Sequence, residues 1–117
     1  MISANEVLRD GFGAHPAFTA VVAEYEGRVV GYVLHRPGYD VVRGGRIWTV
    51  IDLFVTADAR RAGVGRVLML HAREACRRSG NHALVWAVHS CTLAAIAFYE
   101  RLGATFSDDL LVIWQVG

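Results

Sequence analysis

The chain contains no lysine, and all twelve of its Lys+Arg positions are arginine. Eleven Asp and Glu residues nearly balance them, leaving a formal net charge of +1. This balance gives no bulk attraction to nucleic acid or to an anionic membrane surface, so neither is predicted as a partner. Arginine suits bidentate contacts with phosphate, although a GC-rich genome would produce the same bias.

Cysteine is scarce as well, with Cys76 and Cys91 outside any CxxC pair. No disulfide framework is therefore expected, and both are interpreted as buried, reduced thiols. Five histidines show no metal-ligand spacing, so no metal is predicted. The first residues, MISANEVLRD, lack the pattern of a signal peptide, and no apolar run is long enough to cross a bilayer. The expected location is the cytoplasm.

Long polar or low-complexity tracts are also missing, and 54% of the 117 residues are hydrophobic. This composition excludes a disordered chain and predicts one folded domain over residues 1–117.

Hydrophobic periodicity predicts the secondary-structure elements. Strands are expected at 18–25, 28–35, 47–55, 83–88 and 110–116, with helices from about 63 to 78 and from Ser90 or Thr92 to 102. A helical turn or two is conceivable at 4–9, and Pro-Gly and Gly-Gly pairs predict a loop over 36–45. The order indicates an α/β fold with a mixed sheet, in which an antiparallel meander precedes βαβα and a final strand.

Four glycines predict turns, bulges or helix ends within this pattern. Glu26-Gly27 is expected to form a hairpin turn, and Gly31 marks a bulge or a close backbone approach. Gly80 and Gly103 are expected to end the two helices.

The segment ARRAGVGRVL (residues 59–68) joins a predicted buried strand to an amphipathic helix. A helix N-terminus has unpaired amide hydrogens and a partial positive charge, and glycine lets a phosphate approach the backbone. Gly63 and Gly65 suit such a loop, with charge added by Arg60, Arg61 and Arg66. A tight turn with solvated arginines explains the same residues equally well. The pattern is neither a Walker P-loop nor a good dinucleotide fingerprint.

Two motifs in order resemble the GCN5-related N-acetyltransferases. Arg60-x-x-Gly63-x-Gly65 after a strand is similar to that family's coenzyme A pyrophosphate loop. About thirty residues later, AAIAFYERLGATF (94–106) resembles its second signature, a helix that follows the next strand. HPAFTAVVAE and YDVVRGGRIWTVIDLFVTADAR look similar to the diamine (spermidine/spermine-type) acetyltransferase branch.

The resemblance implies acetyl-CoA as co-substrate and assigns roles to several residues. Tyr99 matches the tyrosine that protonates the departing CoA thiolate, and a phenol with a pKa of about 10 is protonated at neutral pH and can do so. Phe54 and Val55 match the strand whose main chain pairs with pantetheine. The pyrophosphate loop comprises these residues: Arg60, Arg61, Ala62, Gly63, Val64, Gly65 and Arg66. Thr92 stands where the family commonly has an asparagine that contacts the cofactor. Its hydroxyl is expected either to contact the cofactor as well or only to cap the helix.

Asp52 is the only charged residue in IWTVIDLFV. Under strict alternation it shares a face with Trp48, Val50 and Phe54. A buried carboxylate needs an arginine, a water-filled cleft or a substrate amine. The matching aspartate of the diamine branch lies in the acceptor cleft, but Ile51 replaces the acidic residue before it. Asp52 is therefore predicted to act on the acceptor side or to form a structural ion pair.

The preferred hypothesis is direct transfer of acetyl from acetyl-CoA to a primary amine. Two alternatives stay open: a CoA-binding module with weak or no catalysis, and a nucleotide-binding domain.

Only seventeen residues precede the first predicted strand, whereas the family fold usually begins with a strand and two helices. An uncovered apolar sheet face is unfavourable for a soluble monomer. A two-fold homodimer is therefore predicted, with its interface near the N-terminal strands and the acceptor cleft.

Overall fold

The computed structural model describes residues 9–88, 92–108 and 112–116. They fall into two compact units, which we call the sheet unit (residues up to 87) and the C-terminal unit (residues from 88). The predicted helical turn at 4–9 lies almost wholly outside the described residues, of which Arg9–Gly11 are helical. Cys91 also lies outside them. No helix in these ranges is long and apolar enough to cross a membrane.

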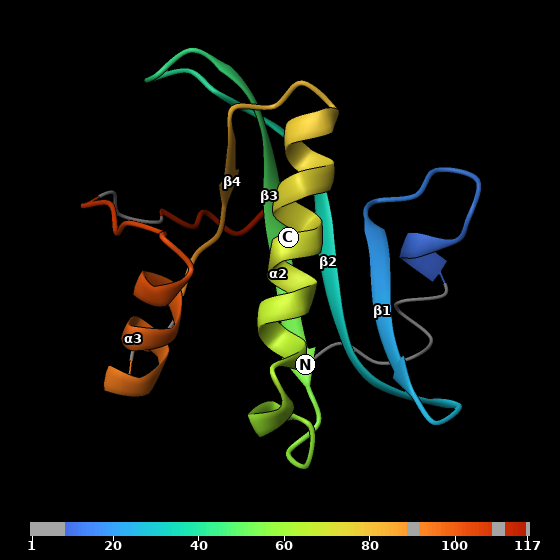
Figure 1. The fold of residues 1–117 in the computed structure, drawn as a ribbon. Helices are drawn as coiled ribbons and strands as arrows, with labels where there is room; N and C mark the ends of the chain where they lie inside the picture. Colours follow the sequence, from blue (N-terminus) through green and yellow to red (C-terminus); the bar gives the residue numbers. More distant parts are fainter. Residues whose placement is uncertain (1–8, 89–91, 109–111, 117) are drawn as a thin grey trace. The chain divides into compact units, whose positions relative to one another are not determined.

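The sheet unit holds a four-stranded mixed sheet in the order β1-β2-β3-β4. Its strands are β1 (Thr19–Tyr25), β2 (Arg28–Asp40), β3 (Gly45–Val55) and β4 (Ala83–Val85). The first three form an antiparallel meander, and β4 lies parallel to β3 (Figure 1). The predicted meander and crossover are thus confirmed, although β4 ends three residues before the predicted boundary.

The two hairpins differ in how well their turns were predicted. Glu26 (φ 51°) and Gly27 (φ 75°) both have positive φ, as the predicted tight turn between β1 and β2 requires. The predicted loop at 36–45 is wrong, because β2 continues to Asp40 and β3 already begins at Gly45. Pro37 can lie in a strand here because β1 pairs with β2 only as far as His35. A missing N–H is tolerated at such an edge.

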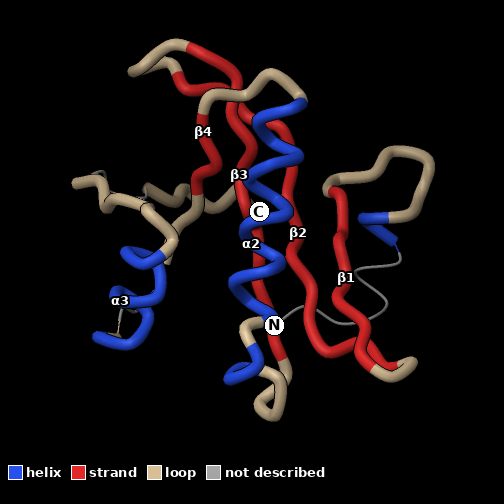
Figure 2. Tube along the Cα trace, viewed as in Figure 1, coloured by secondary structure: helices blue, strands red, loops and turns tan. Residues whose placement is uncertain are grey.

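Helix α2 (Val64–Arg78) packs on one face of the sheet, lying across β2 and β3 in Figure 1 and Figure 2. Its apolar spacing forms a stripe that it buries against the strands. Gly80 (φ 84°) follows the helix end, as predicted. The buried hydrophobic core consists of Val30, Val33, Leu34, Ile47, Val50, Ala59, Leu68, Met69, Ala72 and Cys76. Cys76 is a free thiol, as predicted, and burial raises its pKa.

Gly31 in β2 is close to the neighbouring backbone. A Cβ built there would lie 2.8 Å from the carbonyl oxygen of Phe54, and side chains of Val64 and Leu68 stand within 3.3 Å. The pairing of β1 with β2 shifts register at this point and leaves Val30 as an extra residue. The predicted close approach is therefore confirmed, and a bulge accompanies it.

The C-terminal unit contains α3 (Leu93–Arg101). Its N-cap is Thr92, whose hydroxyl oxygen accepts a 3.1 Å hydrogen bond from the amide of Ala95, and Gly103 (φ 91°) follows its end. The predicted strand at 110–116 is not found at 112–116, and 110–111 lie outside the described residues. A strand exists through pairing with a neighbour, and Val112, Trp114 and Val116 are instead 87%, 91% and 99% exposed.

Candidate functional site

The connection from β3 to α2 contains a backbone conformation that glycine suits best. A short 3₁₀ helix, η1 (Arg60–Ala62), ends at Gly63, which has φ 79° and ψ 16° and is also the N-cap of α2. L-residues with a Cβ disfavour this left-handed region. A Cβ built on Gly63 would meet no atom within 4 Å, so the space above this residue is open.

The first turn of α2 offers free amide hydrogens. The amide of Val67 donates to the Gly63 carbonyl and begins the helical ladder, so the amides of Val64, Gly65 and Arg66 precede any intrahelical acceptor. No side chain of the described residues caps them, and no acidic residue lies in this turn. The helix N-terminus therefore presents a partial positive charge that is available to an anion.

Three arginines flank this helix N-terminus along the chain: Arg60 and Arg61 belong to η1, and Arg66 to the first turn of α2. Arg60 donates from Nε to the Val55 carbonyl oxygen at 3.1 Å, while Arg61 and Arg66 are exposed. Within the described residues, none of the three pairs with a carboxylate. Asp58, the acidic residue of the connection, is instead paired with Arg28 at 2.9 Å. The predicted loop residues thus lie together, with three arginines available to a phosphate.

The outer edge of β3 is open next to this loop. β4 pairs only with Ile47–Thr49, whereas β3 continues to Val55. Among the described residues no strand pairs with β3 on this side beyond Thr49, and Figure 1 shows β4 beside only part of its length. Phe54 and Val55 lie in this open segment. Its unpaired main-chain groups are available to an extended ligand, as in β-augmentation.

A β-bulge decides where Asp52 lies. Leu34 pairs with Asp52 but the next residue, His35, pairs with Val50, so Ile51 is the extra residue. Residues that pair across antiparallel strands share a face, and consecutive residues of a strand point to opposite faces. Asp52 and Val50 therefore lie on opposite faces. The prediction that Asp52 shares a face with Trp48 and Val50 is therefore wrong. The prediction that it shares a face with Phe54 is correct.

Asp52 is bonded to a residue that the sequence analysis did not single out. The hydroxyl of Tyr32 donates a 2.9 Å hydrogen bond to Asp52 Oδ2. Burial of Tyr32, together with this bond and the carboxylate charge, raises the pKa of Tyr32 to about 12. Within the described residues no arginine or histidine forms an ion pair with Asp52, so the predicted structural ion pair is absent there.

The feature of the sequence that could have identified Tyr32 as a candidate is its polar aromatic side chain in a strand of mainly aliphatic residues. That signal does not identify its partner, which depends on the register between β2 and β3.

Tyr99 and Thr92 belong to the C-terminal unit. Tyr99 is half-buried on α3, with its ring centroid 5.4 Å from that of Phe98 and 6.4 Å from that of Phe106. Thr92 caps the same helix, which confirms that its hydroxyl takes the capping role. The structure therefore brings together Asp52, Phe54, Val55 and the loop residues within the sheet unit, and it describes Tyr99 and Thr92 in the C-terminal unit only.

Comparisons with known proteins agree with this geometry. Residues 2–104 match the sequence profile described as the Acetyltransferase (GNAT) family. The chain is 30% identical over 111 residues to a thialysine N-epsilon-acetyltransferase of Bos taurus. The aligned region covers 88% of this chain and 65% of that protein. It is 30% identical over 76 residues to an L-ornithine N5-acetyltransferase of Arabidopsis thaliana, covering 65% of this chain and 33% of that protein. The chain thus spans only part of the length of both relatives.

The fold is shared with solved structures as well. An integron cassette protein of V. cholerae superposes with a TM-score of 0.84 at 24% identity, covering 97% of this chain and 70% of that one. The profile match spans most of the chain and includes both the β3–α2 loop and α3. The chain belongs to the GNAT acetyltransferase family.

Proposed function

We propose that this protein transfers the acetyl group of acetyl-CoA to a primary amine. The observation that carries the proposal is the N-terminus of α2, which begins at a left-handed Gly63. In the described residues it has no side-chain cap, and its three arginines pair with no carboxylate. An anionic ligand with two adjacent phosphates would satisfy both the amides and the arginines.

Coenzyme A has such a pyrophosphate between its adenosine and an extended, amide-containing pantetheine arm. In the proposed complex the pyrophosphate lies against the amides of residues 63–66. The arm runs along the open edge of β3 past Val55 and Phe54, where main-chain groups are available. Thr92 keeps its capping bond and could offer a second one through its hydroxyl.

The reaction requires one bond to form and one to break. The lone pair of the neutral amine attacks the thioester carbonyl carbon, and a C–N bond forms. The C–S bond then breaks, and its electron pair leaves on sulfur as a thiolate. Tyr99 is the proposed acid that protonates this thiolate, because a phenol carries its proton at neutral pH and its ordinary pKa of about 10 lies close to that of a thiol. The proton that the acylated nitrogen then releases restores the phenol, directly or through solvent. The amine, with an ordinary pKa of about 10.4, must lose a proton before attack.

The acceptor is proposed to be a primary amine on an aliphatic chain. Both curated relatives are named for acetylation of a side-chain amine, that of ornithine or of thialysine. Asp52 supports this class, because a half-buried carboxylate beside the apolar side chains of Leu34 and Phe54 attracts an ammonium group.

Calorimetry followed by a thiol-release assay tests the proposal. Acetyl-CoA and CoA should bind while ATP should not, and an amine panel should then release CoA. The absence of lysine helps here, because the enzyme cannot consume acetyl groups on lysine side chains of its own. Binding of CoA without release for any amine would make the protein a CoA-binding module. Preferential binding of ATP would make it a nucleotide-binding domain.

A further inference from the structure

The ion pair between Arg28 and Asp58 differs from the other arginine–carboxylate pairs of this protein. In the described residues, those others join close neighbours in the chain: Arg9 with Asp10, Arg43 with Asp40, and Arg77 and Arg78 with Glu74. Asp58 also has arginines close by, Arg60 and Arg61, two and three positions further on. Its carboxylate nevertheless pairs with Arg28, thirty positions earlier, at 2.9 Å between Nη2 and Oδ2.

The backbone brings these two distant residues together. Arg28 is the first residue of β2, directly after the turn at Glu26–Gly27. Just beyond the end of β3, the amide of Thr56 donates a 2.8 Å hydrogen bond to the carbonyl oxygen of Val30. The start of the β3–α2 connection therefore lies beside the start of β2, and the path of the backbone gives Asp58 its distant partner.

This pairing has a consequence for the two arginines of η1. Elsewhere in the chain an acidic residue pairs with the arginine three positions later, as Asp40 does with Arg43. Asp58 and Arg61 have the same separation. An aspartate is ionised at neutral pH, so without Arg28 the carboxylate of Asp58 would pair with an arginine of η1 or repel a phosphate bound there. Because Arg28 pairs with Asp58, both arginines of η1 are left without a carboxylate partner in the described residues.

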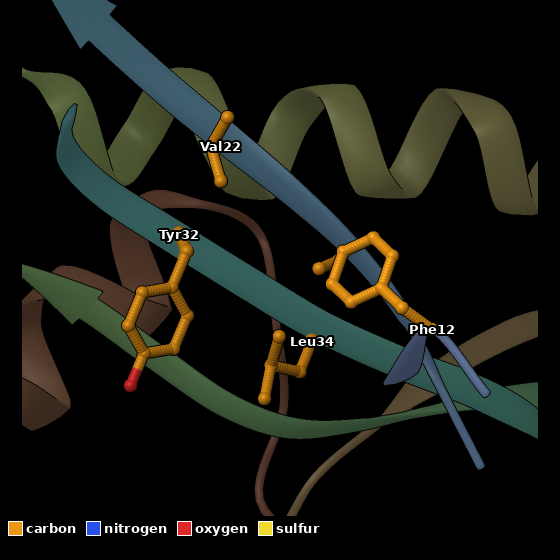
Figure 3. Close-up of a pocket in the computed structure, with 5 residues that line it drawn as sticks. Phe12, Val22, Tyr32 and Leu34 are labelled. Carbon is orange, nitrogen blue, oxygen red and sulfur yellow. The ribbon is translucent and has the colours of Figure 1, made fainter. Parts of the chain in front are cut away.

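The hollow of about 110 Å³ on the sheet face away from α2 offers no such charge. Among the described residues its lining consists of Phe12, Ala20, Val22, Tyr32 and Leu34. Figure 3 shows the hydroxyl of Tyr32 pointing away from the other lining residues, toward β3. An anion is therefore attracted to the β3–α2 connection and not to this hollow.

We propose, resting on the function proposed above, that Arg28 is a positioning residue for the cofactor. It pairs with Asp58 and so keeps this carboxylate away from the pyrophosphate and from the arginines that bind it. Arg28 acts through Asp58 and makes no contact with the cofactor. The two side chains are 63% and 61% exposed, and ion pairs at the surface contribute little to stability. Loss of the pair should therefore change cofactor affinity without unfolding the protein.

Calorimetric titration of a set of variants with CoA tests this role. Arg28→Ala should weaken binding about fivefold, the upper range for an exposed ion pair, which Asp58 can now form within the connection. Arg28→Lys keeps the charge and should bind CoA as the wild type does. Asp58→Asn should not weaken binding, and Arg28→Ala should have little further effect in that background, because no carboxylate remains to be kept away. The control is Arg46→Ala, which removes an exposed charge near the other end of β3 and should leave the affinity unchanged.

Two other roles of Arg28 would give different results, and each would overturn the proposal. If the ion pair only braces the loop, Asp58→Asn should weaken CoA binding as much as Arg28→Ala does. If Arg28 binds a phosphate directly, its removal should weaken CoA binding equally in the Asp58→Asn background. An unchanged affinity in Arg28→Ala would overturn the proposal as well.

Kinetics and salt distinguish this role from a general loss of structure. In Arg28→Ala the KM for acetyl-CoA should rise while kcat stays the same, because only binding is affected. The difference from the wild type should shrink in high salt, which screens charges at the surface. The melting temperature should stay nearly unchanged. A fall in kcat, or a loss of affinity that persists in high salt, would contradict the role proposed for Arg28.

The inference can fail separately from the proposed function. If CoA binds but no amine is acetylated, acetyl transfer fails and the titrations still judge Arg28. If CoA does not bind, the proposed function fails, and inorganic pyrophosphate then replaces it in the titrations. The same order of affinities among the variants would support the role of Arg28, and no binding of pyrophosphate to the wild type would overturn it.

Discussion

The guanidinium of Arg60 donates from Nε to the carbonyl oxygen of Val55 at 3.1 Å, which ties η1 back to the last residue of β3. Arg60 thus ties the loop to β3, while the residue as a whole is exposed to solvent. Its neighbour Arg61 is exposed and has no ion-pair partner in the described part of the chain. The two adjacent arginines therefore have different structural roles, although the sequence alone does not distinguish them.

Replacing these arginines separately should reveal the difference. Arg60→Ala should weaken CoA binding by about tenfold, because it removes a charge and a hydrogen bond worth about 1 kcal/mol that shapes the loop. Arg61→Ala should weaken binding only about threefold and lose that effect in high salt, as a screened surface charge does. Calorimetric titrations at two ionic strengths measure both, with Arg73→Ala on the exterior of α2 as control. Equal losses for Arg60 and Arg61 would contradict a loop-holding role.

A glycine at position 63 can serve the left-handed backbone conformation or the close approach of the phosphates, and two substitutions separate these two roles. Gly63→Val forces a β-branched residue into the left-handed region at about 1–2 kcal/mol, so both the melting temperature and CoA affinity should fall. Gly63→Asn tolerates that conformation, and its side chain enters open space. It should therefore preserve the melting temperature yet still weaken CoA by obstructing the phosphates. Undiminished CoA affinity in a folded Gly63→Asn variant would refute the pyrophosphate assignment.

Tyr99→Phe tests the acid. The ring keeps its contacts with Phe98 and Phe106, so the packing of α3 should be retained and acetyl-CoA affinity should stay nearly unchanged. Turnover with the best amine should fall by about 10²-fold or more, the range that general acids supply. Stopped-flow measurement of thiol release gives the rate of the chemical step. A variant that turns over at the wild-type rate would remove Tyr99 from the mechanism.

The raised pKa of Tyr32 predicts a specific alkaline titration. Of the four tyrosines in the sequence, one should ionise near pH 12, and this step should vanish in Tyr32→Phe. Because the pKa of Tyr32 in the folded protein exceeds the ordinary value of 10.0, the protonated phenol is favoured by folding. Its contribution to the free energy of unfolding is complete below pH 10 and disappears as the pH rises through about 12. Ultraviolet difference spectra at alkaline pH follow the phenolate directly. Asp52→Asn should move the step to lower pH, and an unmoved step would show that the carboxylate does not affect it.

Local signals in the sequence determined much of this protein. The turn at Glu26-Gly27 and the glycines after both helices depend on residues next to one another, and they were predicted correctly. The cap at Thr92 is one of the two that were predicted, the other being Ser90. The β3–α2 loop belongs to the same class, because a strand, a glycine in the left-handed region and a helix N-terminus follow each other within about ten residues. The element order, and with it the fold class, follows from such short-range patterns.

The tertiary structure alone decided on which face Asp52 lies and which residue it contacts. Its face depends on the extra residue Ile51, and a shift of one residue moves a strand's side chains to the opposite face. Its partner Tyr32 lies twenty positions away and meets it only through the register between β2 and β3. The same holds for Pro37, which is tolerated in β2 only because β1 does not reach it. Such pairings are fixed by long-range contacts between strands, and the periodicity of one segment carries no information about the register it adopts against another.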